Sequence, residues 1–363
     1  MSSLPRGSKL GVLDDLPIHQ HANVISQPAS DQWNWTERWY FNLQRRSGEL
    51  VGIIGGGVFR NTAITESYFC FQNGEYQFNT RTTRAVAANP LSDGLVNFEI
   101  IDPMKEWKIN ASHKESEIDV NLKFVASNSP FLFKPFWVGP DRETGEFDQY
   151  EHFVQPGIFT GTVSAHGINF HEGEALTFRD RTWGVRSRRP RLHNWIVLHF
   201  DDGSFMSLVH QETEHGRYHF SHAGIVQKDG SEEILEVESH DITFDPISRI
   251  PQYGVFALRG PRGRAVSLEM SAVGESIRGL GAGYDPMQGK QRSNSEDIMQ
   301  SKWDIKDPEE VERIGRGTID TGVQCAISSS GSRIEGVGVW ETALGVSHYR
   351  YGKQIAEIRK KSS

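Results

Sequence analysis

The chain has 363 residues, of which 37% are hydrophobic and 10% aromatic, and its formal net charge is −8 at pH 7. This length and apolar content are enough for two domains with packed cores, and the negative charge argues against nucleic acid as the main partner. The two cysteines, Cys70 and Cys325, lie far apart in apolar runs, so we predict no disulfide framework and a reducing, cytoplasmic location.

The N-terminal segment 1–32 contains prolines and serines among polar residues, and we predict an arm or lid over the first domain. It lacks the apolar stretch of a signal peptide. No run in the chain approaches the ~18 apolar residues of a membrane helix, so we predict no integral membrane segment. His19 and His21 resemble a metal-binding pair, but no third ligand follows at a matching spacing, and no metal is predicted there.

From Trp33 onward the chain alternates between short apolar runs and turn residues, which is typical of antiparallel strands. Asn73-Gly74 is a strong hairpin signal, and the triplet Gly55–Gly57 within a strand favours a bulge or sharp curvature. Segment 127–149 contains three prolines among aromatic residues. It is expected either to form a flap that packs on the mouth of a barrel or to line a pocket for an apolar ligand. The first series of predicted strands spans 33–43, 50–60, 66–72, 75–81, 95–101, 107–112 and 117–125.

A second strand series follows Pro190, with a hairpin signal at Asp201-Asp202-Gly203. We expect a surface loop at 284–303, a short helix at 307–314 and a solvated, charged tail at 353–363. Arg186, Arg188, Arg189 and Arg191 cluster before this series, where we expect a solvated linker, with anion binding as the alternative. The second series spans 194–200, 204–212, 218–227, 233–244, 255–259, 265–273, 314–328 and 333–344.

Roughly sixteen to twenty short strands favour two antiparallel barrels over one. The predicted fold class is therefore all-β. The predicted organisation is an arm at 1–32, an N-terminal domain at 33–187, a C-terminal domain at 188–352 and the tail.

The stretch from Leu176 to Arg186, LTFRDRTWGVR, combines a strand pattern with several charges. Alternation places Asp180 on one face with Phe178, and Arg179, Arg181 and Trp183 on the other. A carboxylate among apolar neighbours needs a partner, and the flanking arginines are candidates if the strand twists at Gly184. Asp180 is either half of a structural ion pair or a catalytic group.

Hydration or elimination requires an acid, a base and a wall that tolerates positive charge. Asp180 beside Phe178 fits the acid. Glu151 and His152 are adjacent titratable groups on opposite faces of a strand, so we expect only one of them to face a given pocket. Secondary candidates, with hydrogen-bonded structural roles as the alternative, are Glu37, Tyr40, Asn42, Trp340 and Glu341.

The histidines of the second half and the known cofactor-binding motifs are the signals that would indicate a metal or another cofactor. The second half holds several histidines, but the sequence supplies no cysteine or acidic partner that completes a zinc site. The chain has no dinucleotide fingerprint, no nucleophile elbow and no kinase motifs. We therefore predict neither a metal nor another cofactor. The histidines concerned are His199, His210, His215, His219 and His222.

The run RDRTWGVR resembles the signature of the carotenoid 1,2-hydratase (CrtC)/AttH-like superfamily. Three other runs agree with it in order: ERWYFNL at 37–43, YEHFVQPGIFTG at 150–161 and GVGVWE at 336–341. The resemblance implies two consecutive lipocalin-like (calycin-type) barrels. It also implies a functional aspartate in the signature and a histidine about thirty residues upstream, which point to Asp180 and His152, or to Glu151 in place of the histidine. Phe178 departs from the pattern, because an aromatic hydroxyl is expected there.

The strand series and the resemblance together predict a cofactor-independent lyase, hydratase or isomerase. Its expected substrate is a hydrophobic or aromatic small molecule held between the barrels. Two alternatives remain open: a non-catalytic lipocalin-type carrier, and a pericyclase-like scaffold that only folds its substrate. A homodimer is compatible with the sequence. Asp180, His152 and Glu151 are the predicted catalytic residues, and the predicted substrate-binding residues are Arg179, Arg181, Trp183, Phe178, Tyr40, Glu37, Trp137 and Glu341.

Overall fold

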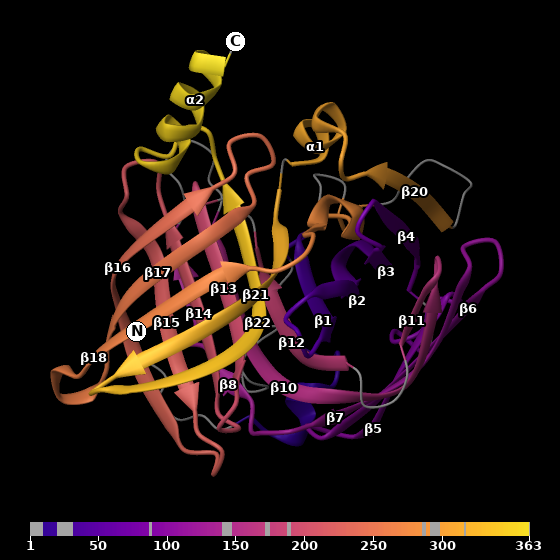
Figure 1. Ribbon diagram of the computed structural model, residues 1–363. Helices are drawn as coiled ribbons and strands as arrows, with labels where there is room; N and C mark the ends of the chain where they lie inside the picture. The colour runs from indigo at the N-terminus through magenta and orange to yellow at the C-terminus, as the bar shows by residue number, and fades with distance from the viewer. Residues whose placement is uncertain are drawn as a thin grey trace.

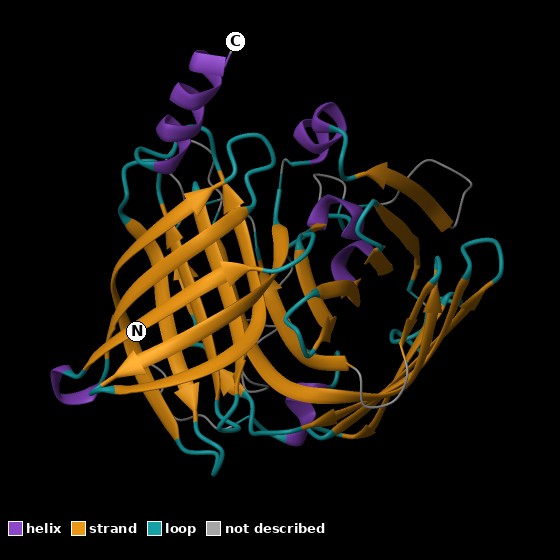
Figure 2. Cartoon of the chain, viewed as in Figure 1, coloured by secondary structure: helices purple, strands orange, loops and turns teal. Residues whose placement is uncertain are grey.

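The computed structural model describes residues 10–19, 32–86, 89–139, 147–170, 175–186, 190–284, 288–290, 298–315 and 317–362. Two large antiparallel sheets stand side by side, and strands dominate the molecule (Figure 1, Figure 2). The predicted all-β class with two lipocalin-like barrels is confirmed. Among the described residues, no helix combines the length and apolar character needed to cross a membrane.

The first sheet is built mainly from the N-terminal half of the chain. Three short strands pair with β10 beside the main path: β8 (Phe131–Leu132), β9 (Phe136–Val138) and β11 (Ile168–Phe170). The main path runs in the order β20 (Ile298–Asp304), β4 (Tyr76–Ala85), β3 (Ile64–Gln72), β2 (Leu50–Phe59), β1 (Trp35–Arg45), β12 (Ala175–Val185), β10 (Asp148–Ala165), β7 (Ile118–Ala126), β6 (Glu106–His113) and β5 (Val96–Asp102).

The second sheet closes on itself as an eight-stranded barrel, because β18 pairs with β21 as well as with β17. A short ninth strand, β19 (Ile277–Arg278), pairs with β21 outside this ring. The ring consists of β13 (Leu192–Phe200), β14 (Phe205–Glu212), β15 (Tyr218–Val226), β16 (Glu232–Phe244), β17 (Pro251–Arg259), β18 (Ala265–Ala272), β21 (Ile319–Ser329) and β22 (Ser332–Leu344).

Helical segments are few and short. Asp307 caps α1 (Pro308–Ile314) by accepting a hydrogen bond from the Glu309 amide at 3.0 Å, which confirms the predicted helix. The tail is not merely solvated: it forms α2 (Tyr351–Ser362), whose Tyr351 and Ile355 pack into the core of the second barrel. The remaining segments are η1 (Val12–Asp15), η2 (Arg60–Thr62), η3 (Pro261–Gly263) and η4 (Gly279–Ala282).

Burial along the strands shows which ones lie between the barrels. In β7, burial alternates strictly, as in a strand with one face in water. In β2, every residue is buried, because one face covers the core of the first sheet and the other covers the second barrel. The seam between the barrels is rich in aromatic side chains from both, including Tyr40, Phe131, Trp195 and Phe205.

Two local predictions need correction. Residues 298–304, expected to lie in a surface loop, form β20 and pair with β4, so the second half of the chain returns to the first sheet (Figure 1). The glycine triplet in β2 keeps a regular register with both neighbouring strands. A Cβ at Gly55 would lie 2.3 Å from the Tyr68 hydroxyl, so glycine makes room for a large side chain rather than for a bulge.

Candidate active site in the seam

The signature strand β12 divides its side chains between two compartments, as alternation predicts. Asp180 lies opposite Tyr40 of β1 and Val154 of β10 in the strand register, and these side chains face the seam. Arg179 and Arg181 point the other way, into the first barrel. Gly184 has φ +133°, and a Cβ there would lie 2.3 Å from the Gln149 carbonyl oxygen, so only glycine fits where β12 meets β10.

The flanking arginines, which were the candidate partners of Asp180, pair with other groups instead. Arg179 forms an ion pair with Asp15 of the N-terminal segment and donates to Gln155 at 2.9 Å. Arg181 pairs with Glu37 at 3.2 Å. The strand itself separates these groups from Asp180.

Trp183 of β12 and Glu37 of β1, two further residues predicted to bind substrate, also lie in the interior of the first barrel. His19 stacks on Trp183 with ring centroids 4.0 Å apart and contacts Glu37 at 3.2 Å. His19 is thus a buried partner of the first barrel. The structure does not bring Arg179, Arg181, Trp183 or Glu37 to the seam pocket.

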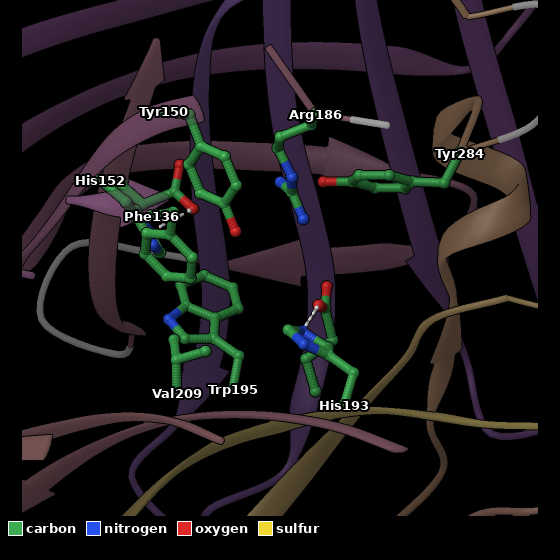
Figure 3. Close-up of a pocket in the computed structure, with 10 residues that line it drawn as sticks. Phe136, Tyr150, His152, Arg186, His193, Trp195, Val209 and Tyr284 are labelled. Atoms are coloured by element: carbon green, nitrogen blue, oxygen red, sulfur yellow. Dashed lines mark hydrogen bonds and ion pairs between the residues drawn. The ribbon is translucent and has the colours of Figure 1, made fainter. Parts of the chain in front are cut away.

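A cavity of about 30 Å³ lies in the seam beside Asp180 (Figure 3). Arg186 is exposed and marks its open side, and its guanidinium points toward the hydroxyl of Tyr284 (Figure 3). Arg188 and Arg189 lie outside the described residues. The cavity is lined by Phe136, Tyr150, His152, Asp180, Arg186, His193, Trp195, Val209, Tyr284 and Glu341.

The first barrel contributes a histidine–carboxylate pair to this pocket. His152 Nε2 lies 3.3 Å from Asp180 Oδ2, and the imidazole stacks on Phe133 at 4.9 Å. Glu151 lies on the opposite face of β10, where burial and the neighbouring Asp14 raise its pKa to about 8. Only the histidine of this adjacent pair therefore reaches the pocket.

The second barrel contributes another pair. His193 Nε2 lies 2.8 Å from Glu341 Oε1, and the Gln211 side-chain amide lies 3.1 Å from His193 Nδ1. If the amide nitrogen donates to Nδ1, the proton of a neutral His193 sits on Nε2 and points at Glu341. Glu341 is thus held by a donor from its own barrel.

Asp320 lies directly across the β21–β22 ladder from Glu341. Burial and the charge of Glu341 raise the pKa of Asp320 well above its usual value. Burial opposes ionisation of Glu341 too, but the His193 hydrogen bond and the Arg186 charge keep the Glu341 pKa below its usual value. These opposite shifts favour the proton on Asp320 and the negative charge on Glu341.

The remaining predicted residues have mixed positions. Tyr40 is buried with its hydroxyl 3.4 Å from Asp320 Oδ2, and it supplies a hydroxyl beside Phe178, whose ring stacks on it at 5.7 Å. Phe178 also meets Trp195, which lines the pocket, edge-on at 5.5 Å. Trp137 is 55% exposed and lies outside the pocket, where its neighbour Phe136 takes the expected place.

Several residues that line the pocket or lie beside it were not identified from the sequence. His193 and Trp195 lie two residues apart in β13, and Asp320 is the one charged residue of β21. A lone carboxylate in an otherwise uncharged strand was the available signal for Asp320. Nothing local distinguishes His193 from the other histidines of this half, because its role depends on the partner that the ladder places beside it.

The site combines two histidine–carboxylate pairs, aromatic walls and one arginine. Such pairs move protons near neutral pH, the aromatic rings suit a flat apolar ligand, and the guanidinium suits an oxygen that gains negative charge. The arrangement can therefore remove a proton at one position and deliver one at another.

Comparison with solved structures supports the fold. A protein described as AttH from Nitrosomonas europaea aligns over 94% of this chain and 99% of its own, with a TM-score of 0.56 and 10% identity. Kievitone hydratase from Nectria haematococca aligns over 85% of this chain and 88% of its own, with a TM-score of 0.47 and 9% identity. The AttH match confirms, at the level of the fold, the resemblance read from the sequence.

Sequence comparison gives the family. No curated protein matches the chain in sequence. The profile described as a domain of unknown function, DUF7064, matches residues 20–285. Since this range covers most of the chain and includes the signature strand, the protein belongs to the DUF7064 family.

Proposed function

We propose that this protein is a cofactor-independent acid/base enzyme that adds water to, or eliminates water from, a carbon–carbon double bond conjugated with a carbonyl. The substrate is an aromatic or otherwise apolar small molecule bound in the seam. One observation carries the proposal: two histidine–carboxylate pairs, His152–Asp180 and His193–Glu341, come from different barrels and line the same pocket.

Arg186 favours a reaction through an enolate over a reaction through a carbocation. A positive charge beside the substrate disfavours a carbocation, whereas it stabilises an enolate oxygen that develops when a nucleophile adds to an enone. The guanidinium is directed into the pocket between Tyr150 and Tyr284. A carbonyl oxygen bound there would place the conjugated double bond among the aromatic rings.

The proton transfers balance without a redox partner. In hydration, His152, supported by Asp180, takes a proton from the water that forms a bond to the β-carbon. The enolate then takes a proton at the α-carbon from the carboxyl pair, delivered from Glu341, with Asp320 as the positioning residue that holds this proton in the resting state. When the product leaves, His152 gives up its proton to solvent and the carboxyl pair takes one from solvent, which restores the resting state. Elimination is the reverse, and proton transfer between two carbons by the same groups gives isomerisation.

The size of the cavity implies a change on binding. A space of about 30 Å³ holds roughly one water molecule, so an aromatic substrate must displace side chains of the wall. Arg186 and Tyr284 lie outside the strands, and we expect them to move first.

The test is conversion of aryl enones and aryl β-hydroxy ketones by the full-length protein in H₂¹⁸O, followed by mass spectrometry. We expect labelled hydroxyl in the product, and a loss of turnover of about 10²-fold or more in Asp180→Asn and in His193→Gln, the size of a general acid–base contribution. Asp320→Asn is expected to fold and to lose turnover as well, because the neutral amide keeps the packing but has no acidic proton.

Glu269→Gln is the matched control, since it removes a carboxylate that pairs with Arg333 at the surface. Equal turnover in Asp180→Asn and this control would refute the assignment of Asp180. Binding with recovery of unaltered ligand would favour the carrier, and conversion with a flat pH–rate profile would favour a pericyclase-like scaffold.

A further inference from the structure

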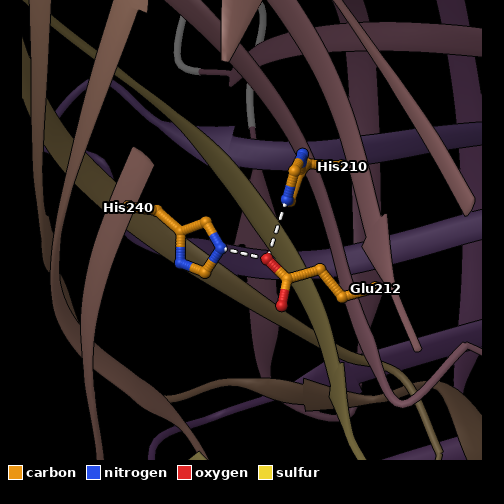
Figure 4. Close-up of side chains that lie close together, drawn as sticks. All are labelled: His210, Glu212 and His240. Atoms are coloured by element: carbon orange, nitrogen blue, oxygen red, sulfur yellow. Dashed lines mark hydrogen bonds and ion pairs between the residues drawn. The ribbon is translucent and has the colours of Figure 1, made fainter. Parts of the chain in front are cut away.

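A second buried polar cluster lies inside the second barrel, apart from the seam pocket. His210 and Glu212 lie two residues apart on β14, on the face that carries the barrel-core residues Met206 and Leu208. His240 projects from β16 and approaches Glu212 across the barrel interior (Figure 4). The ligand atoms of His210, Glu212 and His240 all lie within 4.8 Å of one another.

One carboxylate forms the centre of the cluster. Glu212 Oε1 lies 3.0 Å from His210 Nε2 and 2.5 Å from His240 Nε2. Its other oxygen, Oε2, lies 3.0 Å from Nε2 of His348, which follows β22. The four side chains are at most 7% exposed, so the hydrogen-bonding groups have little access to bulk water.

In His348 and His240, the ring nitrogen that faces away from Glu212 is Nδ1. Its hydrogen-bond partner indicates which nitrogen of each ring carries the proton. The Tyr351 amide donates to His348 Nδ1 at 3.2 Å, so the His348 proton is on Nε2 and orients the carboxylate. The Tyr351 hydroxyl lies 3.4 Å from the His240 carbonyl oxygen, to which it can donate, and 2.9 Å from His240 Nδ1. If the Tyr351 hydroxyl donates its proton to the carbonyl oxygen, then the hydroxyl oxygen accepts a hydrogen bond from His240 Nδ1–H.

His240 Nε2 then presents a lone pair to a carboxylate oxygen at 2.5 Å. Two acceptors at this distance share a proton. A metal ion would take the place of that proton, with the nitrogen and the oxygen moving apart to the roughly 3 Å separation of two zinc ligands. His210 is compatible with the same arrangement, because its Nδ1 lies 3.0 Å from the Ser221 hydroxyl, which can accept a proton and leave Nε2 free.

We propose that His210, Glu212 and His240 form a binding site for a divalent transition-metal ion of the zinc class. Two imidazole nitrogens and one carboxylate oxygen are a ligand set that zinc takes, with the fourth position left to water. Ser221, Tyr351 and His348 are the outer partners that fix ring orientation and carboxylate position, as hydrogen-bonded neighbours of metal ligands do. The site is independent of the proposed reaction in the seam.

Because of where the cluster lies, a bound ion would hold separate elements of the second barrel together. It would connect β14 with β16 and, through His348 and Tyr351, with the start of α2. Ion binding to the folded state alone stabilises it by mass action. Zinc is therefore expected to raise the melting temperature and to hold α2 on the barrel.

The experiment uses the full chain, treated with a chelator and desalted, and titrated with Zn²⁺ alone by calorimetry and with Co²⁺ by visible absorption. We expect one equivalent to bind, a Co²⁺ spectrum of low coordination number, and a zinc-dependent rise in melting temperature. Glu212→Gln and His240→Gln are expected to weaken binding at least 100-fold. His348→Gln should retain the stoichiometry with about 10–100-fold weaker binding.

His215→Gln is the matched control, because this nearby histidine is 77% exposed and should leave the affinity unchanged. The wild-type Co²⁺ spectrum tests the site even if a variant fails to fold. Absence of saturable binding in the wild type would overturn the proposal and favour a protonated imidazole in the cluster. Equal affinities of Glu212→Gln, His240→Gln and the control would also overturn it.

Discussion

Asp180 and Arg181 are neighbours in the chain, yet their side chains serve different compartments. Strand alternation sends Asp180 to the seam, where His152 is its partner, and Arg181 into the first barrel, where Glu37 is its partner. The same alternation separates His152 from Glu151 on β10. A single strand pair thus supplies a reactive site on one face and a buried ion-pair network on the other.

Glu151 offers a test of this division at the level of one residue. Its raised pKa, about 8 in the folded state, means that the folded protein holds a proton which the unfolded chain releases near pH 4.5. The stabilising contribution of this proton is present below pH 4.5 and is lost as the pH rises toward 8. The slope is at most about 1.4 kcal/mol per pH unit.

We therefore expect Glu151→Gln to reduce the fall in unfolding free energy between pH 5 and pH 8, as measured by urea denaturation. Glu99→Gln, at an exposed position of β5, is the control and should reproduce the wild-type slope. An unchanged slope in Glu151→Gln would show that this carboxyl ionises as it does in the unfolded chain.

The N-terminal segment 10–19 acts as a structural element of the first barrel. Asp15 accepts hydrogen bonds from the Trp107 indole at 2.9 Å and the Met104 amide at 2.7 Å, in addition to its ion pair with Arg179. Arg179 in turn lies over the rings of Trp107 and Phe153, each at 5.2 Å from the centroid. The segment thereby supplies the carboxylate that pairs with the buried Arg179 guanidinium of β12.

Removal of one member of this pair is expected to be costly. Arg179→Met should lower the unfolding free energy by about 3–5 kcal/mol, because it leaves the buried Asp15 carboxylate without its cation. Arg333→Met removes an arginine from an exposed ion pair with Glu269 and should cost no more than about 1 kcal/mol. Both losses are measured by urea denaturation. Equal losses in the two variants would show that the buried Arg179–Asp15 pair contributes no more to the unfolding free energy than the exposed pair does.

At the scale of the whole molecule, the two barrels share an aromatic core, and the second half of the chain contributes one strand to the first sheet. The aromatic seam contains residues from both sheets, and β20 crosses from the second half of the chain to pair with β4. The first sheet is therefore not complete without the second half of the chain.

We expect the two barrels to unfold together in a single cooperative transition. Scanning calorimetry should give a calorimetric enthalpy equal to the van't Hoff enthalpy, and fluorescence and circular dichroism should report the same midpoint. Two resolved transitions, or a van't Hoff enthalpy well below the calorimetric one, would show that the barrels are energetically independent.

The sequence predicts the site only in part. Asp180 and His152 were identified from alternation and from the resemblance, and they do meet in the seam. His193, Asp320 and Arg186 were not assigned to the site, because their partners come from strands far along the chain. Arg179, Arg181 and Trp183 were also assigned to it, but the structure places them inside the first barrel, since the pattern shows which face they share but not which core lies against that face.

The sequence by itself determined the all-β class, most strands and the two faces of β12, because these depend on local alternation and turn residues. Tertiary structure alone decided that the N-terminal segment neutralises Arg179, that β20 returns to the first sheet, and that Asp320 lies beside Glu341. Each of these depends on contacts between distant segments, and burial then sets the energy of the charges that meet there.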